Sequence, residues 1–166
     1  MEIYINDTNI LIDLAKLDLL SAFSQLNARL YTTDFIVAEI EDSTQRKKVD
    51  EFIKKGMLEV VALNGEEITE IYTLRTENNG LTVDDCSVWF VADKYNGTLL
   101  TGDARLRKRA SEYGIDVRGI IYVFDELVKN GILDEQTARL KLMNLRAVNP
   151  RLPEKEINNR LRLWKT

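Results

Sequence analysis

The chain has 166 residues, of which 45% are hydrophobic and 30% charged, and its formal net charge is −4. This length is typical of a single domain, and the apolar share is sufficient for a packed core, which excludes a disordered or fibrous protein. The longest apolar runs fall well short of the roughly 20 residues of a membrane-spanning helix, and the N-terminus lacks a secretory signal, so we expect a cytoplasmic protein without a membrane partner.

Hydrophobic periodicity and turn residues divide the chain into alternating strands and helices. The first half is predicted to contain strand Glu2–Asn6, helix Asn9–Leu20 with a second helical stretch to about Leu26, strand Leu30–Thr33, a helix through Glu41 with Asp34 as its N-cap, helix Thr44–Lys55, strand Leu58–Leu63 and helix Glu66–Thr76. The second half is predicted to contain helix Val83–Tyr95, strand Thr98–Thr101, helix Ala104–Tyr113, strand Asp116–Arg118, and helices Ile120–Lys129, Glu135–Asn144 and Glu154–Trp164. Such alternation requires crossover connections, so we predict an α/β fold: a three-layer α/β/α sandwich with a central parallel sheet of about four or five strands, followed by C-terminal helices.

Four acidic residues lie just after predicted strands or on the helices that follow them: Asp7, Glu39, Asp85 and Asp103. Ligands of open α/β sheets bind beyond the carboxyl ends of the strands, so all four side chains are expected at one edge of the sheet. Carboxylates held close together repel one another unless hard cations lie between them. The pattern therefore predicts a divalent-metal site.

Each acid also has a purely structural interpretation. Asp7 and Asp103 fit helix N-caps, and Thr82 with Asp85 fits a capping box. Glu39 can be an exposed helix residue, although it lies in an otherwise apolar stretch where a carboxylate is costly unless it is paired or metal-bound. Asp84 is adjacent to Asp85, so the assignment between these two neighbours is open.

The chain contains no histidine, and Cys86 is its only cysteine. This composition excludes Ser-His-Asp and Cys-His catalysis, histidine-ligated zinc and an internal disulfide. Any catalytic chemistry must therefore use carboxylates, hydroxyls, lysines or metal-bound water.

With these motifs the chain resembles the PIN-domain family of metal-dependent ribonucleases, over about Met1–Gly131. The similarity lies in Asp7-Thr8-Asn9-Ile10-Leu11-Ile12 after the first strand, Glu39, Asp85 at the start of the most apolar helix, and Thr101-Gly102-Asp103 ahead of Leu106. The resemblance implies a PIN-like nuclease domain over residues 1–131 and a C-terminal helical extension over residues 132–166, packed on the same domain.

The resemblance also implies roles for residues. The metal-binding and catalytic acids would be Asp7, Glu39, Asp85 and Asp103, and Asn9 and Thr101 would be polar supports. Arg105 stands where some family members carry a further acid. The implied activity is Mg²⁺- or Mn²⁺-dependent endonucleolytic hydrolysis of single-stranded RNA. The implied biology is that of a toxin that forms a homodimer and has an antitoxin-like partner.

Basic residues offer a further route to nucleic acid. Arg105, Arg107 and Lys108 follow Asp103 and are candidates for phosphate contacts, although a solvated helix face explains them equally well. Residues 139–166 carry eight basic and two acidic side chains, a net charge of +6, so the rest of the chain carries −10. This basic tail is compatible with nucleic-acid contact or with an ordinary solvated face.

Apolar residues in two segments allow either a core or a functional interpretation. Trp89, Phe90 and Tyr95 lie in the most apolar helix, which favours core packing over base stacking. Ile157, Leu161 and Trp164 form an apolar stripe that favours packing on the chain's own domain; contact with a twin subunit or a partner is the alternative.

Three rival functions share parts of this pattern. A catalytically silent PIN-like binding module and a DNA-directed flap-type nuclease both remain compatible with the four acids. A phospho-acceptor receiver domain requires an aspartate at the end of the third strand, but that strand ends in Leu63-Asn64-Gly65, which argues against it.

Overall fold

The computed structural model describes residues 1–165, so Thr166, the last residue of the predicted C-terminal extension, lies outside the described residues. Within that range one sheet is formed by β1 (Glu2–Asn6), β2 (Ala28–Thr33), β3 (Glu59–Val61), β4 (Thr98–Leu100) and β5 (Val117–Arg118). All pairings are parallel, and the strand order is β3-β2-β1-β4-β5. The predicted α/β fold with a parallel sheet is confirmed, with five strands.

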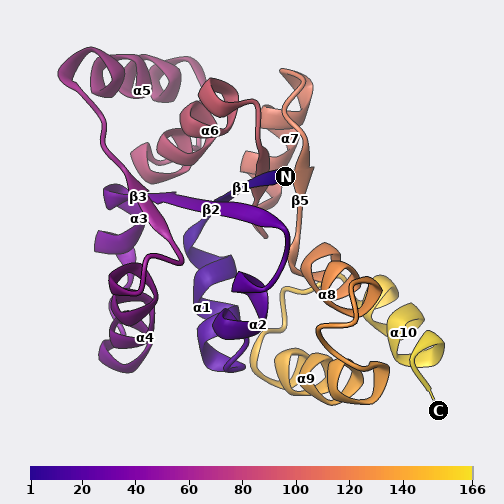
Figure 1. Cartoon of the computed structure of the whole chain (residues 1–166). Coiled ribbons are helices and arrows are strands. Elements are labelled where there is room, and N and C mark those ends of the chain that lie inside the picture. The colour runs from indigo at the N-terminus through magenta and orange to yellow at the C-terminus, as the bar shows by residue number, and fades with distance from the viewer. Residues whose placement is uncertain (166) are drawn as a thin grey trace.

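Helices cover both faces of this sheet (Figure 1). They are α1 (Thr8–Lys16), α2 (Leu20–Ser24), α3 (Asp34–Glu39), α4 (Ser43–Lys54), α5 (Gly65–Glu77), α6 (Val83–Tyr95), α7 (Ala104–Glu112), α8 (Ile120–Lys129), α9 (Glu135–Val148) and α10 (Glu154–Leu163). In Figure 1, α5, α6 and α7 lie on one side of the sheet, whereas α1, α2, α4, α8 and α9 lie on the other. No helix of residues 1–165 has the length and apolarity needed to cross a bilayer.

The strand order changes direction at β1, which lies between β2 and β4. The chain leaves β1 toward β2 on one side and later returns to β4 on the other, so the loops after β1 and β4 meet at a topological switch point. The backbone N–H of Asp7, directly after β1, donates to the carbonyl of Leu100 at the end of β4, with an N–O distance of 3.0 Å. This hydrogen bond holds the ends of β1 and β4 together at the edge of the sheet where the candidate site lies.

Most predicted bounds fall within a couple of residues of the observed ones, but two helix ends do not. Helix α1 ends at Lys16 rather than Leu20, because Asp18 adopts a positive φ of 54° that breaks the helix before α2. Helix α9 continues past the predicted end at Asn144 to Val148, because Leu145 is buried on the core.

The predicted N-cap of α3 was wrong by one residue. Thr33 has extended backbone angles and its Oγ1 accepts a hydrogen bond from the N–H of Ile36 at 3.3 Å, so Thr33 is the N-cap. Asp34 is the first helical residue, and its carboxylate contacts only the next N–H, that of Phe35, at 3.0 Å. Both residue types favour this position, and the sequence alone did not distinguish them.

The C-terminal helices share the main core. Ile157 and Trp164 are 1% and 3% exposed, and the Trp164 ring lies 6.3 Å from the ring of Phe124 on α8. The apolar stripe of the tail therefore packs on its own domain, as predicted. Trp89 is likewise buried, and Phe90 and Tyr95 pack against the core, as predicted for the most apolar helix.

One contact between the C-terminal helices and α1 involves a buried acid. Asp13 on α1 is 6% exposed, and its Oδ2 accepts a hydrogen bond from Nδ2 of Asn149, the residue after α9, at 3.4 Å. Burial raises the pKa of Asp13 to about 6, against which the contacts with Asn149 and Lys16 act. A pKa above the ordinary 3.8 means that ionisation of Asp13 destabilises the fold as the pH rises through 6.

We therefore expect Asp13→Asn to raise the free energy of unfolding at pH 8 by about 1–2 kcal/mol, with the gain vanishing at pH 4, where Asp13 is protonated in the folded state. Urea unfolding at both pH values measures this difference. Asp18→Asn is the matched control with the opposite sign, because the ion pair with Lys48 lowers the pKa of Asp18. Equal destabilisation by Asp13→Asn at both pH values would contradict the prediction.

Candidate active site

Asp7 occupies the centre of the candidate site. It follows the central strand β1, is the N-cap of α1, and is only 4% exposed. Its Oδ1 accepts a hydrogen bond from the N–H of Thr8 at 2.9 Å, and its Oδ2 accepts one from Oγ1 of Thr101 at 2.5 Å. The carboxylate is thus held in one orientation by groups from two neighbouring strand ends.

Asn9 and Thr101, the two predicted supports, both contact Asp7 and the loop before α7. Asn9 Nδ2 lies 3.4 Å from Asp7 Oδ2, and Asn9 Oδ1 accepts from the N–H of Gly102 at 2.9 Å. Thr101 Oγ1 donates to Asp7 and accepts from the N–H of Asp103 at 3.1 Å. Together they join the loop after β1 to the loop after β4, and their supporting role in function stays a prediction.

Asp85 and Asp103 lie at the first turns of α6 and α7 and take the capping roles that the sequence allowed. Asp103 Oδ1 accepts from the N–H of Leu106 at 2.9 Å. Asp85 Oδ2 accepts from the N–H of Thr82 at 2.9 Å, and Thr82 Oγ1 accepts in return from the N–H of Asp85 at 3.1 Å, which completes a capping box. Each side chain is half-buried, and each cap uses only one of its two carboxylate oxygens.

Glu39, the last residue of α3, is exposed, which agrees with the structural interpretation that the sequence allowed for this residue. The helical period places Ile36 and Val37 toward the core and leaves Glu39 on the open side. Its Oε2 nevertheless accepts a hydrogen bond from Thr8 Oγ1 at 2.7 Å, directly beside Asp7. The structure therefore places Glu39 at the rim of the same edge.

Mutual repulsion shows that these carboxylates lie within electrostatic reach of one another. Burial, followed by the charges of Asp85 and Glu39, raises the pKa of Asp7 to about 7, although its hydrogen bonds with Thr101 and Thr8 oppose this rise. Burial also raises the pKa of Asp85, as do the charges of Asp103 and Glu39. Within residues 1–165, no lysine or arginine forms an ion pair with any of the four acids. Direct contact with a basic side chain therefore does not neutralise their negative charge.

Two further side chains belong to this edge: Thr8, for which the sequence predicted no role, and Asp84, the open alternative to Asp85. Thr8 holds Glu39, as described above, and Asp84 lies against Glu39, so that burial and then the neighbouring carboxyl group raise the pKa of Asp84 to about 6. Adjacent residues on a helix differ by about 100° in direction, which lets Asp85 act on Asp7 while Asp84 faces Glu39. Their signal in the sequence was adjacency alone: Thr8 stands between Asp7 and Asn9, and Asp84 precedes Asp85.

A buried hydroxyl pair positions the helices that carry these acids. Thr33 Oγ1, at the end of β2, lies 2.8 Å from Ser87 Oγ on α6. Ser87 Oγ donates to the carbonyl of Asp84 at 2.7 Å, and Thr33 caps α3, which ends at Glu39. The pair therefore couples the orientation of α3 to that of α6.

The donor set fits a hard divalent cation. All candidate ligands are oxygen atoms, which suit Mg²⁺ or Mn²⁺ rather than a thiolate- or imidazole-preferring metal. Across the part of the chain that the structure describes, no three acidic or cysteine side chains stand close enough to hold one ion as placed. An ion held by one or two of these carboxylates and by water is compatible with this placement, whereas three carboxylate ligands would require a side-chain rotation, for which the exposed Glu39 has the most freedom.

The predicted nucleic-acid contacts Arg105, Arg107 and Lys108 are exposed on α7, next to this edge. The Arg105 side chain lies over Gly80 in the turn before α6, where a β-carbon would be 3.0 Å from Arg105 Nη1. Gly80 has a φ of +90°, a backbone conformation that favours glycine, whereas the flexible Arg105 side chain could move away from a β-carbon. Arg107 Nη2 donates to the carbonyl of Thr101 at 3.4 Å. Arg105 thus lies on the rim between α6 and α7.

Fold and site together define a class of protein: a three-layer α/β domain with carboxylates gathered at the switch point of a parallel sheet. The family model DUF3368, described as a PIN domain, matches residues 3–166. The chain belongs to the PIN-domain family.

Two solved structures share the fold. VapBC-1 from nontypeable Haemophilus influenzae is similar with a TM-score of 0.51 and 22% identity, over 71% of this chain and 98% of that chain. VapBC2 from Rickettsia felis, bound to a DNA fragment from its promoter, is similar with a TM-score of 0.50 and 17% identity, over 70% of this chain and 98% of that chain. Among curated proteins none matches this chain.

The raised pKa of Asp7 predicts a conflict between stability and ion binding. Ionisation of Asp7 lowers the stability of the folded protein as the pH rises toward 7. Asp7→Asn should therefore raise the free energy of unfolding by about 2 kcal/mol at pH 8 without metal, and should give no gain at pH 4. Mg²⁺ or Mn²⁺ should raise the unfolding midpoint of the wild type but not that of Asp7→Asn.

Thermal unfolding at pH 4 and pH 8, with either ion or EDTA, measures both effects. Asp50→Asn, which changes an exposed acid on α4 outside the site, should keep the full metal response. An identical metal-induced shift in the wild type and in Asp7→Asn would remove Asp7 from the ligand set.

Proposed function

We propose that this PIN-domain protein is a Mg²⁺- or Mn²⁺-dependent endoribonuclease that hydrolyses phosphodiester bonds of single-stranded RNA. One observation carries the proposal: Asp7, Glu39, Asp85 and Asp103, from four separate parts of the chain, meet at one sheet edge without a basic counterion. Uncompensated carboxylates at a ligand-binding edge are best explained by a cation that arrives with the substrate. The proposed setting is the cytoplasm.

In the proposed mechanism, Asp7 and Asp103 would hold the main ion, and Glu39 and Asp85 would orient the attacking water or hold a second ion. A bound divalent ion supplies a readily deprotonated water and positive charge for the phosphate. Hydrogen bonds from Thr101 Oγ1 and from the N–H of Thr8 fix the orientation of the Asp7 carboxylate. The hydrogen bond from Thr8 Oγ1 likewise orients the carboxylate of Glu39. The products are a 5′-phosphate and a 3′-hydroxyl, and no histidine is needed.

Single-stranded RNA suits this edge for a geometric reason. The central carboxylate is buried beside β1, so one phosphate must approach closely, which a flexible single strand does more easily than a duplex. Arg105, Arg107 and Lys108 on the α7 rim would bind flanking phosphates. Similarity to VapBC proteins further supports a toxin role, with an antitoxin-like protein as partner and a homodimeric assembly.

Cleavage of labelled single-stranded RNA and DNA tests the activity directly. We expect cleavage with Mn²⁺ or Mg²⁺, none with EDTA, and a loss of at least about 100-fold in Asp7→Asn and Asp103→Asn, because each replaces an anionic ligand by a neutral side chain of nearly the same size. Asp50→Asn is the matched control and should cleave like the wild type. Full activity in either site variant, with the fold intact, would refute the assignment. Faster DNA than RNA cleavage would point to a flap-type nuclease.

The basic rim makes a separate prediction about substrate binding. Arg105→Ala and Lys108→Ala should each raise KM for RNA by about threefold to tenfold while kcat stays near the wild-type value, because these residues contact flanking phosphates rather than the reacting one. The effect should shrink as salt rises. Lys54→Ala on α4, far from this rim in the sequence, serves as the control. A fall in kcat with unchanged KM would assign the two residues a different role.

A further inference from the structure

Helix α9 is apolar on both of its faces. Ala138, Leu142 and Leu145 are fully buried against the core. The opposite face carries a second apolar row, here called the α9 stripe, formed by Leu140, Met143, Ala147 and Val148. Leu140 and Val148 are each 57% exposed and Met143 is 40% exposed. Exposed Asn144 lies on the same face between Leu140 and Val148, so the stripe is apolar except for one amide. Several exposed apolar residues on one helix face differ from scattered surface apolar residues and are a candidate interaction surface.

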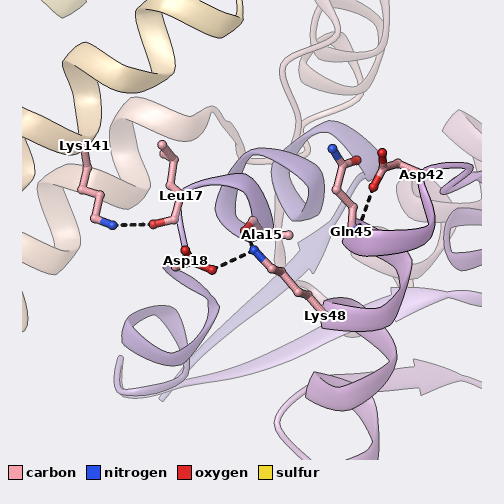
Figure 2. Close-up of polar contacts among 7 residues, drawn as sticks. All are labelled: Ala15, Leu17, Asp18, Asp42, Gln45, Lys48 and Lys141. Carbon is pink, nitrogen blue, oxygen red and sulfur yellow. Dashed lines mark hydrogen bonds and ion pairs between the residues drawn. The ribbon is translucent and has the colours of Figure 1, made fainter.

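Basic side chains border the α9 stripe on both sides. The helical period of 100° per residue places Arg139 and Arg146 along one border and Lys141 along the other. Lys141 Nζ donates to the carbonyl of Leu17 at 2.7 Å (Figure 2), Arg139 Nη1 to a carbonyl of α10 at 2.7 Å, and Arg146 Nη1 to an amide oxygen of α10 at 3.1 Å. These three cations are therefore fixed in place, yet within residues 1–165 none of them pairs with a carboxylate.

A cavity of about 460 Å³ continues the stripe at the C-terminal end of α1. Its lining consists of Lys16, Leu17, Asp18, Lys141, Asn144 and Val148. Figure 2 shows Lys141 and Lys48 reaching this end of α1 from two sides, and Lys48 already neutralises Asp18 at 2.8 Å. The hollow therefore combines apolar side chains with uncompensated positive charge. It lies at the opposite end of α1 from Asp7, roughly 13 Å along the helix axis.

We propose that the α9 stripe and the adjoining cavity form the docking site for an amphipathic helix of a partner protein, with an apolar row at spacings of three and four residues and acidic residues on its flanks. The apolar row would pack on Leu140, Met143 and Val148. The acids would pair with the cations of the two borders. This inference goes beyond the nuclease proposal and stands without it.

Charge and shape favour this occupant over three others. A second copy of the chain, paired about a twofold axis, would bring the same cations of both copies together. Single-stranded RNA stacks on aromatic side chains, and the α9 stripe is entirely aliphatic. A bilayer surface is flat, whereas Leu17 and Val148 line a hollow. An acidic amphipathic helix satisfies both the positive borders and the concave shape.

Two synthetic helical peptides, each about as long as α9, test the site on the full chain. Both carry the same leucine row, but one has glutamate flanks and the other lysine flanks, and fluorescence anisotropy measures their binding. We expect the glutamate peptide to bind, more weakly as salt rises, and the lysine peptide not to bind. The double variant Leu140→Ser/Met143→Ser should weaken binding by about tenfold or more. Tyr72→Ser, at a 47% exposed residue on α5, should not.

Both altered positions of the double variant are exposed, so its urea unfolding should match that of the wild type, which separates lost docking from lost folding. Absence of binding by the glutamate peptide, or equal affinity for both peptides, overturns the proposal. Sedimentation that shows a dimer dispersed by the double variant would assign the surface to a second copy instead. Binding to anionic lipid vesicles that the double variant abolishes would assign it to a membrane surface, again against the proposal.

Discussion

A buried carboxylate at the end of the central strand is the constraint on which the site depends. Asp7 is nearly inaccessible, and water cannot solvate its charge, so its stabilisation comes from Thr101 and from the N–H of Thr8. These two bonds do not offset its burial, since its pKa still rises to about 7. The protein thus keeps a group whose ionised form opposes folding, which makes Asp7 a candidate for a functional position.

Capping and ligand roles reinforce each other at this edge. Three helix N-termini, those of α1, α6 and α7, converge there, and each carries an acid of the site: Asp7, Asp85 and Asp103. The N-terminal end of a helix stabilises negative charge through its dipole and its free N–H groups. The fold therefore tolerates gathered carboxylates before any ion is present. The structural interpretation of each acid is correct without excluding the functional one, because a cap occupies only part of a carboxylate.

The sequence predicted best the elements whose ends carry strong local signals. Helix α6 has its predicted bounds because Thr82 forms a capping box and Asn96 adopts the left-handed conformation that ends the helix. Prediction failed where tertiary packing decides. The length of α9 depends on the burial of Leu145, and the exposure of Glu39, which the sequence left open, depends on which side of the short helix α3 meets the core. Neither is a property of nearby residues alone.

The same limitation hid the α9 stripe. The exposure of Leu140, Met143 and Val148 depends on which face of α9 the core covers, so the residue pattern alone did not identify an apolar surface on this helix. The stripe and the acidic edge lie at opposite ends of α1. A helix docked on the stripe alone therefore leaves Asp7 open to substrate. Inhibition through this surface would require a second segment of the partner that extends along α1 to the acids, so docking there anchors a partner rather than blocking the site by itself.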